Sequence, residues 1–332
     1  MNRVPTRLPR LAALRGSAVL ARQTVVRCVR VAACVLPAVI GACSSSSVPT
    51  PVPTAATPPV APSREWALVW ADEFAGAERA PIDQTKWRYD TGTAYPGGPS
   101  QWGTGEIETM TASADNVSLD GLGHLAITPL RAADGKWTSG RIETQRVDFR
   151  APVGGAMAVE FSIELPAVTN TNGLGYWPAA WLLGGAYRSN PLSWPSIGEI
   201  DVMEAVNGRG TTIATLHCGS SIPGPCNEYI GLTSGEVPCD CQVGFHVFRA
   251  ELDRAIVPQV IRWYRDGTYF HAIQQTAVDS TTWAAATSGG FMILLNVSIG
   301  GALPSALGGG PTGATVSGKP MRVDYVRVYQ RP

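Results

Sequence analysis

The chain has 332 residues, of which 16% are charged, and its formal net charge is zero. Without a basic excess it cannot hold a nucleic-acid backbone by charge, so we expect no nucleic-acid partner, whereas a neutral polysaccharide needs no such attraction. Glycine (36 residues) and proline (26 residues) are abundant, and no stretch shows a sustained helical period with caps. The composition therefore predicts many short strands and turns.

The first 42 residues have the features of an export signal. Arg27 and Arg30 precede an apolar run over 31–42, which is too short to span a membrane. The run ends in Ile-Gly-Ala-Cys43 before several serines, and this resembles a bacterial lipoprotein signal in which Cys43 is lipidated. The alternative is an ordinary secretory signal with an incidental cysteine. We predict a cell-envelope lipoprotein, on the outer face or in the periplasm, or a secreted protein, with membrane contact only through a lipid on Cys43.

Residues 43–64 form a predicted linker. They are rich in serine, proline and threonine and have almost no large apolar side chains, so they cannot bury enough surface to fold. From residue 65 to residue 332 the composition is that of a globular protein, with no second linker and no repeat. We therefore predict a single domain over 65–332.

Four cysteines lie inside this domain, namely Cys218, Cys226, Cys239 and Cys241. An even number of cysteines in an exported chain predicts two disulfide bonds, and the sequence leaves three pairings open. A zinc site is the alternative, but the four contain no pair with CxxC spacing.

Alternation of apolar and polar residues predicts an all-β domain. Over 157–165, apolar side chains occupy every second position, which is typical of a half-buried strand. Further strands are predicted at 123–130, 141–149, 211–218, 291–299 and 322–329, together with a hairpin over 259–273 that turns at Arg265-Asp266-Gly267. So many strands in one domain predict an antiparallel two-sheet sandwich or β-jelly roll.

Three acidic residues lie on one predicted strand within 199–204. A regular strand places Glu199 and Asp201 on one face and Glu204 on the other, among core residues, where an unpaired carboxylate is costly. A one-residue β-bulge near Val202 and Met203 returns Glu204 to the face of the other two acids. We therefore predict a bulge at this point.

Three carboxyl groups on one face fit the hydrolysis of a glycosidic bond with retention of configuration. One carboxylate attacks the anomeric carbon while a second, protonated carboxyl group protonates the leaving oxygen. We predict Glu199 as the nucleophile, Asp201 as the residue that orients it, and Glu204 as the acid/base, because the neighbouring anions raise its pKa. For the acids taken alone, the alternatives are a solvated edge strand and a calcium site.

Residues near the acids are predicted to bind the substrate. The strand at 211–218 follows a turn and, if it pairs with the acidic strand, brings Thr215 and His217 beside the acids. Trp177, Trp181 and Trp194 lie close upstream, and indoles stack well on sugar rings. We also expect at least one of these three tryptophans to belong to the core.

These residues resemble family 16 of the glycoside hydrolases, in its laminarinase-like group. The strongest similarity runs through 175–184 and 194–204. Further similar motifs precede it at 68–74, 105–108 and 138–144 and follow it at 215–217, 295–301 and 323–329. The extra residue in the acidic strand is the bulged form of laminarinases and of agar- or carrageenan-degrading relatives, whereas the unbulged form is typical of lichenases.

The resemblance implies an antiparallel two-sheet jelly roll of the concanavalin A type with a concave substrate cleft. It implies a retaining endo-β-glycoside hydrolase of β-1,3- or mixed β-1,3/1,4-glucan that needs no cofactor for its chemistry, and we expect a monomer. It also implies a structural calcium near the backbone of Glu73, with the side chain of Asp324 as a ligand. The predicted substrate-binding residues are Trp102, Glu106, Arg141, Trp177, Trp181, Trp194, His217 and Asn296.

Two departures from the family keep other functions open. Gly105 stands where the family commonly has asparagine, which affects the sugar contacts on the non-reducing side. The segment 218–241 is longer than in the simplest laminarinases and is expected to overhang the leaving-group side. The alternatives are an endo-β-1,3-galactanase or other galactan hydrolase of the family, a glycan transglycosylase, and a non-catalytic carbohydrate-binding envelope protein, although a binder does not need all three acids.

Overall fold

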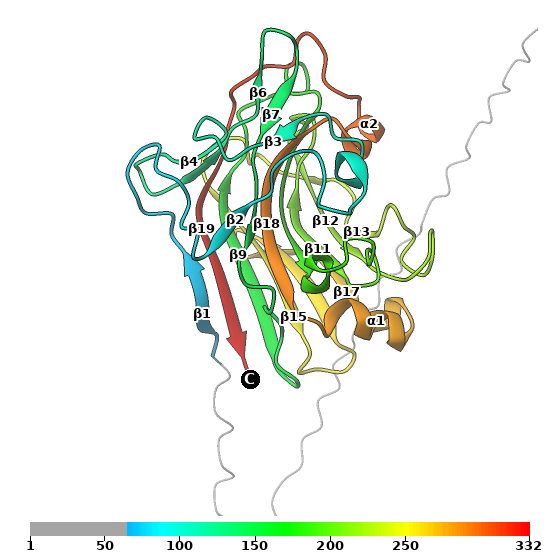
Figure 1. Cartoon of the computed structure of the whole chain (residues 1–332). Coiled ribbons are helices and arrows are strands. Elements are labelled where there is room, and N and C mark those ends of the chain that lie inside the picture. The colour runs from blue at the N-terminus through cyan, green and yellow to red at the C-terminus, as the bar shows by residue number, and fades with distance from the viewer. Residues whose placement is uncertain (1–64) are drawn as a thin grey trace, which may run out of the picture. The chain divides into compact units, whose positions relative to one another are not determined.

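The computed structural model describes residues 65–332, so the predicted signal and linker lie outside the described residues. The described part consists mainly of two eight-stranded antiparallel sheets (Figure 1). Among its helices, none has the length and apolar character to cross a membrane. The predicted all-β, two-sheet jelly roll is confirmed.

The first sheet has the strand order β17-β16-β15-β9-β19-β5-β4, with β1 paired to β19. The first and last strands of the domain therefore lie side by side (Figure 1). Its strands are β1 (Ala67–Asp72), β4 (Val117–Leu119), β5 (Leu125–Ile127), β9 (Ala156–Glu164), β15 (His246–Asp253), β16 (Val260–Arg265), β17 (Thr268–Gln274) and β19 (Met321–Arg331).

The second sheet has the order β13-β12-β11-β10-β18-β8-β2, with β14 paired to β12. It contains the acidic strand β11 between β10 and β12, close to one edge of the sheet. Its strands are β2 (Trp87–Tyr89), β8 (Arg141–Thr144), β10 (Tyr176–Gly184), β11 (Glu199–Glu204), β12 (Thr211–His217), β13 (Leu232–Thr233), β14 (Val237–Pro238) and β18 (Phe291–Ile299).

Smaller elements complete the described part. A three-stranded sheet contains β3 (Thr109–Met110), β7 (Trp137–Ser139) and β6 (Leu130–Arg131), with β3 and β7 parallel. The helices are α1 (Ser280–Thr287) and α2 (Ala302–Ala306), and the 3-10 turns are η1 (Ser100–Gly103), η2 (Gly185–Arg188) and η3 (Gln275–Ala277).

The two large sheets bury their apolar faces in one common core. In β9 the side chains of Val159, Phe161 and Ile163 are buried, as the alternation over 157–165 predicts. On the other face of β9, Glu160 and Glu164 form ion pairs with arginines of the neighbouring strands β15 and β19. Because each face of the strand has its own kind of partner, a slip by one residue would expose the core side chains.

The predicted hairpin over 259–273 is also confirmed. Strands β16 and β17 pair with each other, and the two residues between them, Asp266 and Gly267, have φ values of 49° and 74°. Positive φ at both central residues is the requirement of the hairpin turn that matches the twist of the strands.

The described domain also contains a short capped helix that the sequence did not predict. In α1 the Asp279 carboxylate accepts hydrogen bonds from the backbone N–H groups of Thr281 and Thr282, so it caps the N-terminus. The helix has only eight residues, which is too short for a visible apolar period, and it buries Trp283. The strand predicted over 141–149 is also shorter than expected, because β8 ends at Thr144.

Replacement of Phe161 tests the common core. Phe161→Ala should lower the free energy of unfolding by about 3–5 kcal/mol, because it removes a fully buried ring and leaves a cavity. Urea denaturation of the purified domain measures this change. The control Leu122→Ala, at a side chain that is 80% exposed, should change stability by less than about 0.5 kcal/mol. Equal effects of the two substitutions would contradict the packing described here.

Candidate active site

The acidic strand β11 contains the predicted bulge. Its pairing with β12 matches Glu199 to His217 and Asp201 to Thr215, and then shifts before Glu204. Its pairing with β10 shifts at the same place, because Asp201 and Met203 oppose consecutive residues of β10. Val202 is therefore the extra residue, and the predictions of the bulge and of the pairing with β12 are confirmed.

The bulge lets the strand bury apolar side chains and still keep Glu204 with the other acids. Val202 and Met203 are both buried in the core between the sheets. Glu204 accepts a hydrogen bond of 2.9 Å from the indole Nε1 of Trp177. Its carboxyl group also lies close enough to Asp201 and His217 to be affected by the charges of both. The three acids thus form one electrostatic cluster.

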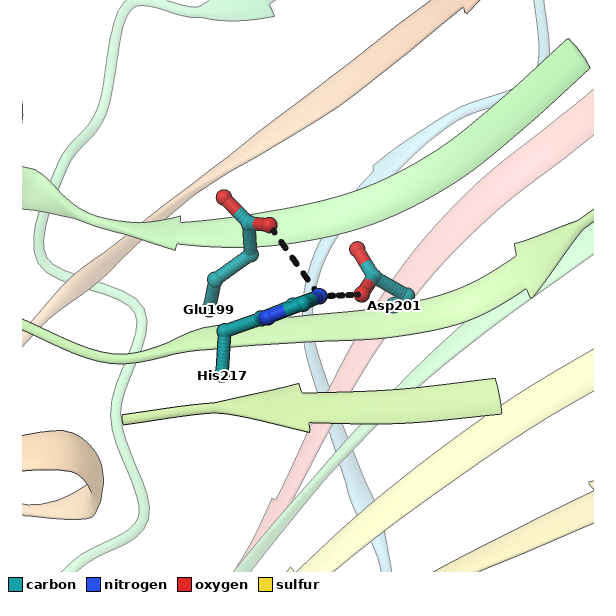
Figure 2. Close-up of side chains that lie close together, drawn as sticks. All are labelled: Glu199, Asp201 and His217. Atoms are coloured by element: carbon teal, nitrogen blue, oxygen red, sulfur yellow. Dashed lines mark ion pairs between the residues drawn. The ribbon is translucent and has the colours of Figure 1, made fainter. Parts of the chain in front are cut away.

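His217 is the cationic partner of this cluster. Figure 2 shows its imidazole between Glu199 and Asp201, with Nε2 at 3.4 Å from Asp201 Oδ2 and 3.9 Å from Glu199 Oε1. On the other side of the ring, Nδ1 lies 2.6 Å from Glu228 Oε2. The predicted position of His217 beside the acids is therefore confirmed, and Glu228 is an addition to the predicted set.

Burial and charge shift the ionisation of the cluster. Burial, followed by the negative charge of Asp201, raises the pKa of both Glu199 and Glu204 to about 8. Burial opposes the cationic form of His217, but the contacts with the carboxylates of Asp201 and Glu228 outweigh it and raise the pKa of His217 well above 6.5. The cluster therefore keeps carboxyl protons near neutral pH, as a general acid requires.

A chain of hydrogen bonds joins three of the predicted substrate-binding residues. Trp181 Nε1 donates to Asn296 Oδ1 at 2.8 Å, and Asn296 Nδ2 donates to Ser298 Oγ at 2.9 Å. Ser298 Oγ in turn donates to Glu106 Oε2 at 2.7 Å, while Thr104 Oγ1 donates to Glu106 Oε1. These hydrogen bonds fix the indole of Trp181, which lies opposite Asp201 in the sheet register.

Arg141 and Trp102 occupy the same region, but Arg141 is a support and not a surface contact. Only 5% of Arg141 is exposed. Its guanidinium lies between two indoles, 4.5 Å from the ring centre of Trp102 and 4.9 Å from that of Trp181, and its Nε donates to Asp90. Its burial leaves it little surface for a sugar, and the cation–π contacts hold the two indoles in place.

The expectation that a tryptophan among Trp177, Trp181 and Trp194 belongs to the core is wrong. All three are half-buried, whereas the neighbouring Tyr176 is fully buried. Alternation along β10 explains the difference, because Tyr176 points toward the core and Trp177 points away from it. The indoles that do fill the core come from elsewhere in the sequence, including Trp87, Trp263 and Trp283.

The segment 218–241 packs against the catalytic face. Its cysteines pair as Cys218–Cys226 and Cys239–Cys241, so one of the three open pairings is realised. The ring of Trp194 lies 5.6 Å from that of His217 and is stacked at 6.0 Å on Tyr229, which is 69% exposed. The segment therefore provides one inward acid, Glu228, and one outward aromatic side chain, Tyr229.

Glu228 and Tyr229 were not predicted from the sequence. They lie in an irregular loop, 11 and 12 residues after His217, where neither strand alternation nor a motif fixes the direction of a side chain. The available signal is weak. It consists of an acid and an aromatic residue inside a cysteine-closed insertion that directly follows a predicted site histidine.

The calcium predicted near Glu73 and Asp324 stays a prediction. Asp324 accepts a hydrogen bond from Ser162, and both oxygens of Glu73 accept hydrogen bonds from Arg327. Among the described residues, three metal-capable side chains come together at Glu199, Asp201 and His217 and not at Asp324. A calcium ion at Asp324 would therefore depend mainly on backbone carbonyl groups.

Comparison with solved structures gives close relatives over the whole described domain. The endo-1,3-beta-glucanase from Streptomyces sioyaensis is 49% identical and superposes with a TM-score of 0.79, covering 82% of this chain and 99% of that protein. The endo-beta-1,3-glucanase from Pyrococcus furiosus is 32% identical with a TM-score of 0.63, covering 80% of this chain and 95% of that one.

Comparison by sequence agrees with these structures. Residues 165–233 match the family model described as an XgeA-like, catalytic GH16 domain. The glucan endo-1,3-beta-glucosidase A1 of Niallia circulans is 30% identical in an alignment of 292 positions that covers 79% of this chain but only 38% of that longer relative. The beta-glucanase of Rhodothermus marinus is 29% identical over 80% of this chain and 85% of its own length.

The fold and the acid cluster define a glycoside hydrolase of the two-sheet jelly-roll type. More particularly, the chain belongs to glycoside hydrolase family 16 and is similar to its laminarinase-like members.

The raised pKa of Glu204 predicts a pH-dependent gain of stability on its replacement. The pKa is 4.5 for an ordinary Glu and about 8 for Glu204 in the fold, so the folded protein binds this proton more tightly than the unfolded chain does. The stability that the proton contributes is complete below pH 4.5 and is lost as the pH rises to about 8. Glu204→Gln should therefore raise the melting temperature relative to the wild type at about pH 9, and by less at about pH 5.

Thermal unfolding of both proteins at both pH values measures this gain. The control Glu164→Gln removes an acid paired with Arg322 on the far face of β9, so it should show no gain at high pH. A gain of equal size at the two pH values would contradict the assigned ionisation.

Proposed function

We propose that the protein is a retaining endo-hydrolase of β-1,3-glucan that also accepts mixed β-1,3/1,4-glucan. The observation that supports this most strongly is the cluster of Glu199, Asp201 and Glu204 on one face of the second sheet, beside the imidazole of His217. Two structural relatives are themselves endo-β-1,3-glucanases, and a third is described as a non-specific endo-beta-1,3(4)-glucanase from family GH16.

In the first step, a carboxylate oxygen of Glu199 attacks the anomeric carbon. The bond between that carbon and the glycosidic oxygen breaks, and the proton of Glu204 passes to the leaving oxygen, so the product is a glycosyl ester of Glu199 and a free sugar hydroxyl. A charged His217, at 3.9 Å, favours the anionic form of Glu199, and the attack requires that form. Asp201 contacts the same nitrogen of this imidazole, Nε2, at 3.4 Å.

In the second step, Glu204 accepts a proton from water while the water oxygen attacks the anomeric carbon. The ester bond to Glu199 breaks, and both carboxyl groups return to their initial state. Esterification removes the charge of Glu199, which lowers the pKa of Glu204 at the moment when it must act as a base. Two inversions at one carbon give net retention.

The half-buried indoles beside the acids provide surfaces for the glucan. Trp177 contacts Glu204, Trp181 lies opposite Asp201, and Trp194 lies against His217. Their rings are held by hydrogen bonds or ring contacts but remain partly accessible. An apolar ring face next to a reacting bond fits the apolar face of a sugar, and fixed rings reduce the entropy lost on binding.

Replacement of the nucleophile tests the mechanism. Glu199→Gln should remove turnover of laminarin, because the amide cannot form the ester, while the circular dichroism spectrum stays native-like and the melting temperature does not fall below that of the wild type. The control Glu164→Gln should keep wild-type turnover. NMR of the first product released by the wild type should show the β-anomer. Full activity of Glu199→Gln, or an α-anomer as first product, would disprove the assignment.

The substrate panel for the same assay should extend beyond glucans. A curated relative that is 27% identical over 81% of this chain is a keratan-sulfate endo-1,4-beta-galactosidase. Reducing-sugar release from laminarin, lichenan, agarose, carrageenan and β-1,3-galactan separates the proposed glucanase from a galactan hydrolase. Release of longer products from short oligosaccharides identifies a transglycosylase.

We propose that the protein is exported and anchored through a lipid on Cys43. The support comes from the signal-like segment before Cys43 and from the two disulfide bonds of the domain, which form and persist in oxidising compartments. Cys43→Ser should move the protein from the membrane fraction to the soluble fraction, as followed by fractionation and immunoblot. Equal distribution of both forms would show that Cys43 carries no anchor.

A further inference from the structure

Glu228 is a buried acid outside the set of three on β11. Its side chain has no exposed surface, although it lies in the loop after Cys226. Oε2 accepts a hydrogen bond from His217 Nδ1 at 2.6 Å, and Oε1 accepts one from the backbone N–H of Cys218 at 2.9 Å. Both oxygens are therefore engaged, and both partners belong to the end of β12 or the residue that follows it.

The loop is shaped to bring Glu228 to this position. The disulfide bond between Cys218 and Cys226 closes the loop directly after β12. Gly231 then passes so close to the imidazole that an added Cβ would lie 2.9 Å from His217 Nδ1, and its φ is +74°. Glycine is required there, because any larger residue would push the loop and Glu228 away from His217.

The bond to Glu228 fixes the orientation of the imidazole. A carboxylate oxygen can only accept, so Nδ1 carries a proton and donates it to Glu228. The ring is then held with Nε2 directed at Asp201 and Glu199, as Figure 2 shows. An acid that orients a histidine through Nδ1 while Nε2 faces the reacting groups also stabilises the charged imidazole.

We propose that Glu228 is a positioning residue of the reaction, which holds His217 as a cation against Asp201 and Glu199 and thereby sets the pH range of activity. This inference rests on the proposed glycoside hydrolysis at the same site.

The charges around His217 explain why its cationic form matters. Glu199 and Asp201 face it from β11, Glu228 faces it from the loop, and Glu204 lies within electrostatic reach. With Glu204 protonated for its role as an acid, three carboxylates remain around one cation. Loss of that cation would raise the pKa of Glu199, so the nucleophile would be protonated over a wider pH range.

Glu228→Gln removes the charge of the positioning residue and keeps its shape. Without the neighbouring anion, His217 loses its proton at lower pH, and Glu199 and Glu204 then lose the nearby cation. The lost charge of Glu228 by itself lowers the pKa of Glu199, but the charge of His217 has the larger effect on that pKa. Both limbs of the kcat/KM profile should therefore move to higher pH, by about one pH unit. At the optimum of the wild type, kcat on laminarin should fall by about tenfold or more, with little change in KM, because the sugar contacts are unchanged.

The matched control is Glu236→Gln on the same segment. Glu236 pairs with Arg209 and Thr211 at the other end of β12, away from the imidazole. Its replacement removes one acid from the same segment and should leave the pH profile at that of the wild type. A shift of equal size in both variants would indicate a general effect of net charge and would overturn the proposal.

Two results would show that Glu228 is only structural. One is a folded Glu228→Gln protein with the wild-type pH profile, and the other is an equal loss of activity at every pH. Glu228→Asp, which keeps the charge on a shorter side chain, should return the pH profile toward that of the wild type even if kcat stays low. Failure of this rescue would also overturn the proposal.

An NMR titration of His217 makes the test independent of activity and of the folding of the variants. In the wild type the imidazole should keep its proton well above pH 6.5. A titration at or below that value would overturn the proposal, even if no Glu228 variant folds. Inactivity of the wild type on every glycan would instead disprove the proposed function, while the imidazole titration still decides the contact with Glu228.

Discussion

The extra residue in β11 determines whether an active site exists on this sheet. Without Val202 as a bulged residue, Glu204 would point into the core, away from Glu199 and Asp201. The apolar side of the strand holds the bulge in place, because Val202 and Met203 are both buried. Trp263 of the opposite sheet adds a hydrogen bond of 2.9 Å from its Nε1 to the carbonyl oxygen of Asp201. The core thus fixes the geometry of the acids on the other face.

The bulge also creates an electrostatic cost that the surroundings must offset. Three acids are brought together with little exposed surface, and burial alone disfavours their ionised forms. The protein responds with one imidazolium, held between acids on both of its nitrogens. A site of this kind gains its reactivity at the expense of stability, because groups with raised pKa values destabilise the fold as they ionise.

The sequence was informative wherever a repeating constraint fixed the direction of a side chain. Alternation identified β9, and the Asp266-Gly267 turn identified the hairpin. The positions of Glu199 and Glu204, an odd number of residues apart, were enough to predict the bulge. Pairing across a short turn placed His217 beside the acids. These arguments need only the period of a strand and the cost of burying a charge.

The sequence did not predict side-chain positions in segments that lack the alternation of a strand. Glu228 reaches His217 through an irregular loop, and the pairing of the four cysteines depends on that same path. The contacts of Arg141 were not predicted, because its partners Trp102 and Trp181 come from distant segments. The short helix α1 was missed because its cap, and not its apolar pattern, defines it.

Adjacent residues of the loop after Cys226 serve the two sides of the site at once. Glu228 points inward to His217, while Tyr229 lies outward against Trp194 with most of its surface free. A change of this loop during evolution would therefore alter both the exposed aromatic surface beside Trp194 and the charge balance at the acids. Relatives that differ in this insertion are expected to differ both in glycan preference and in the pH optimum of activity, because one loop affects both properties.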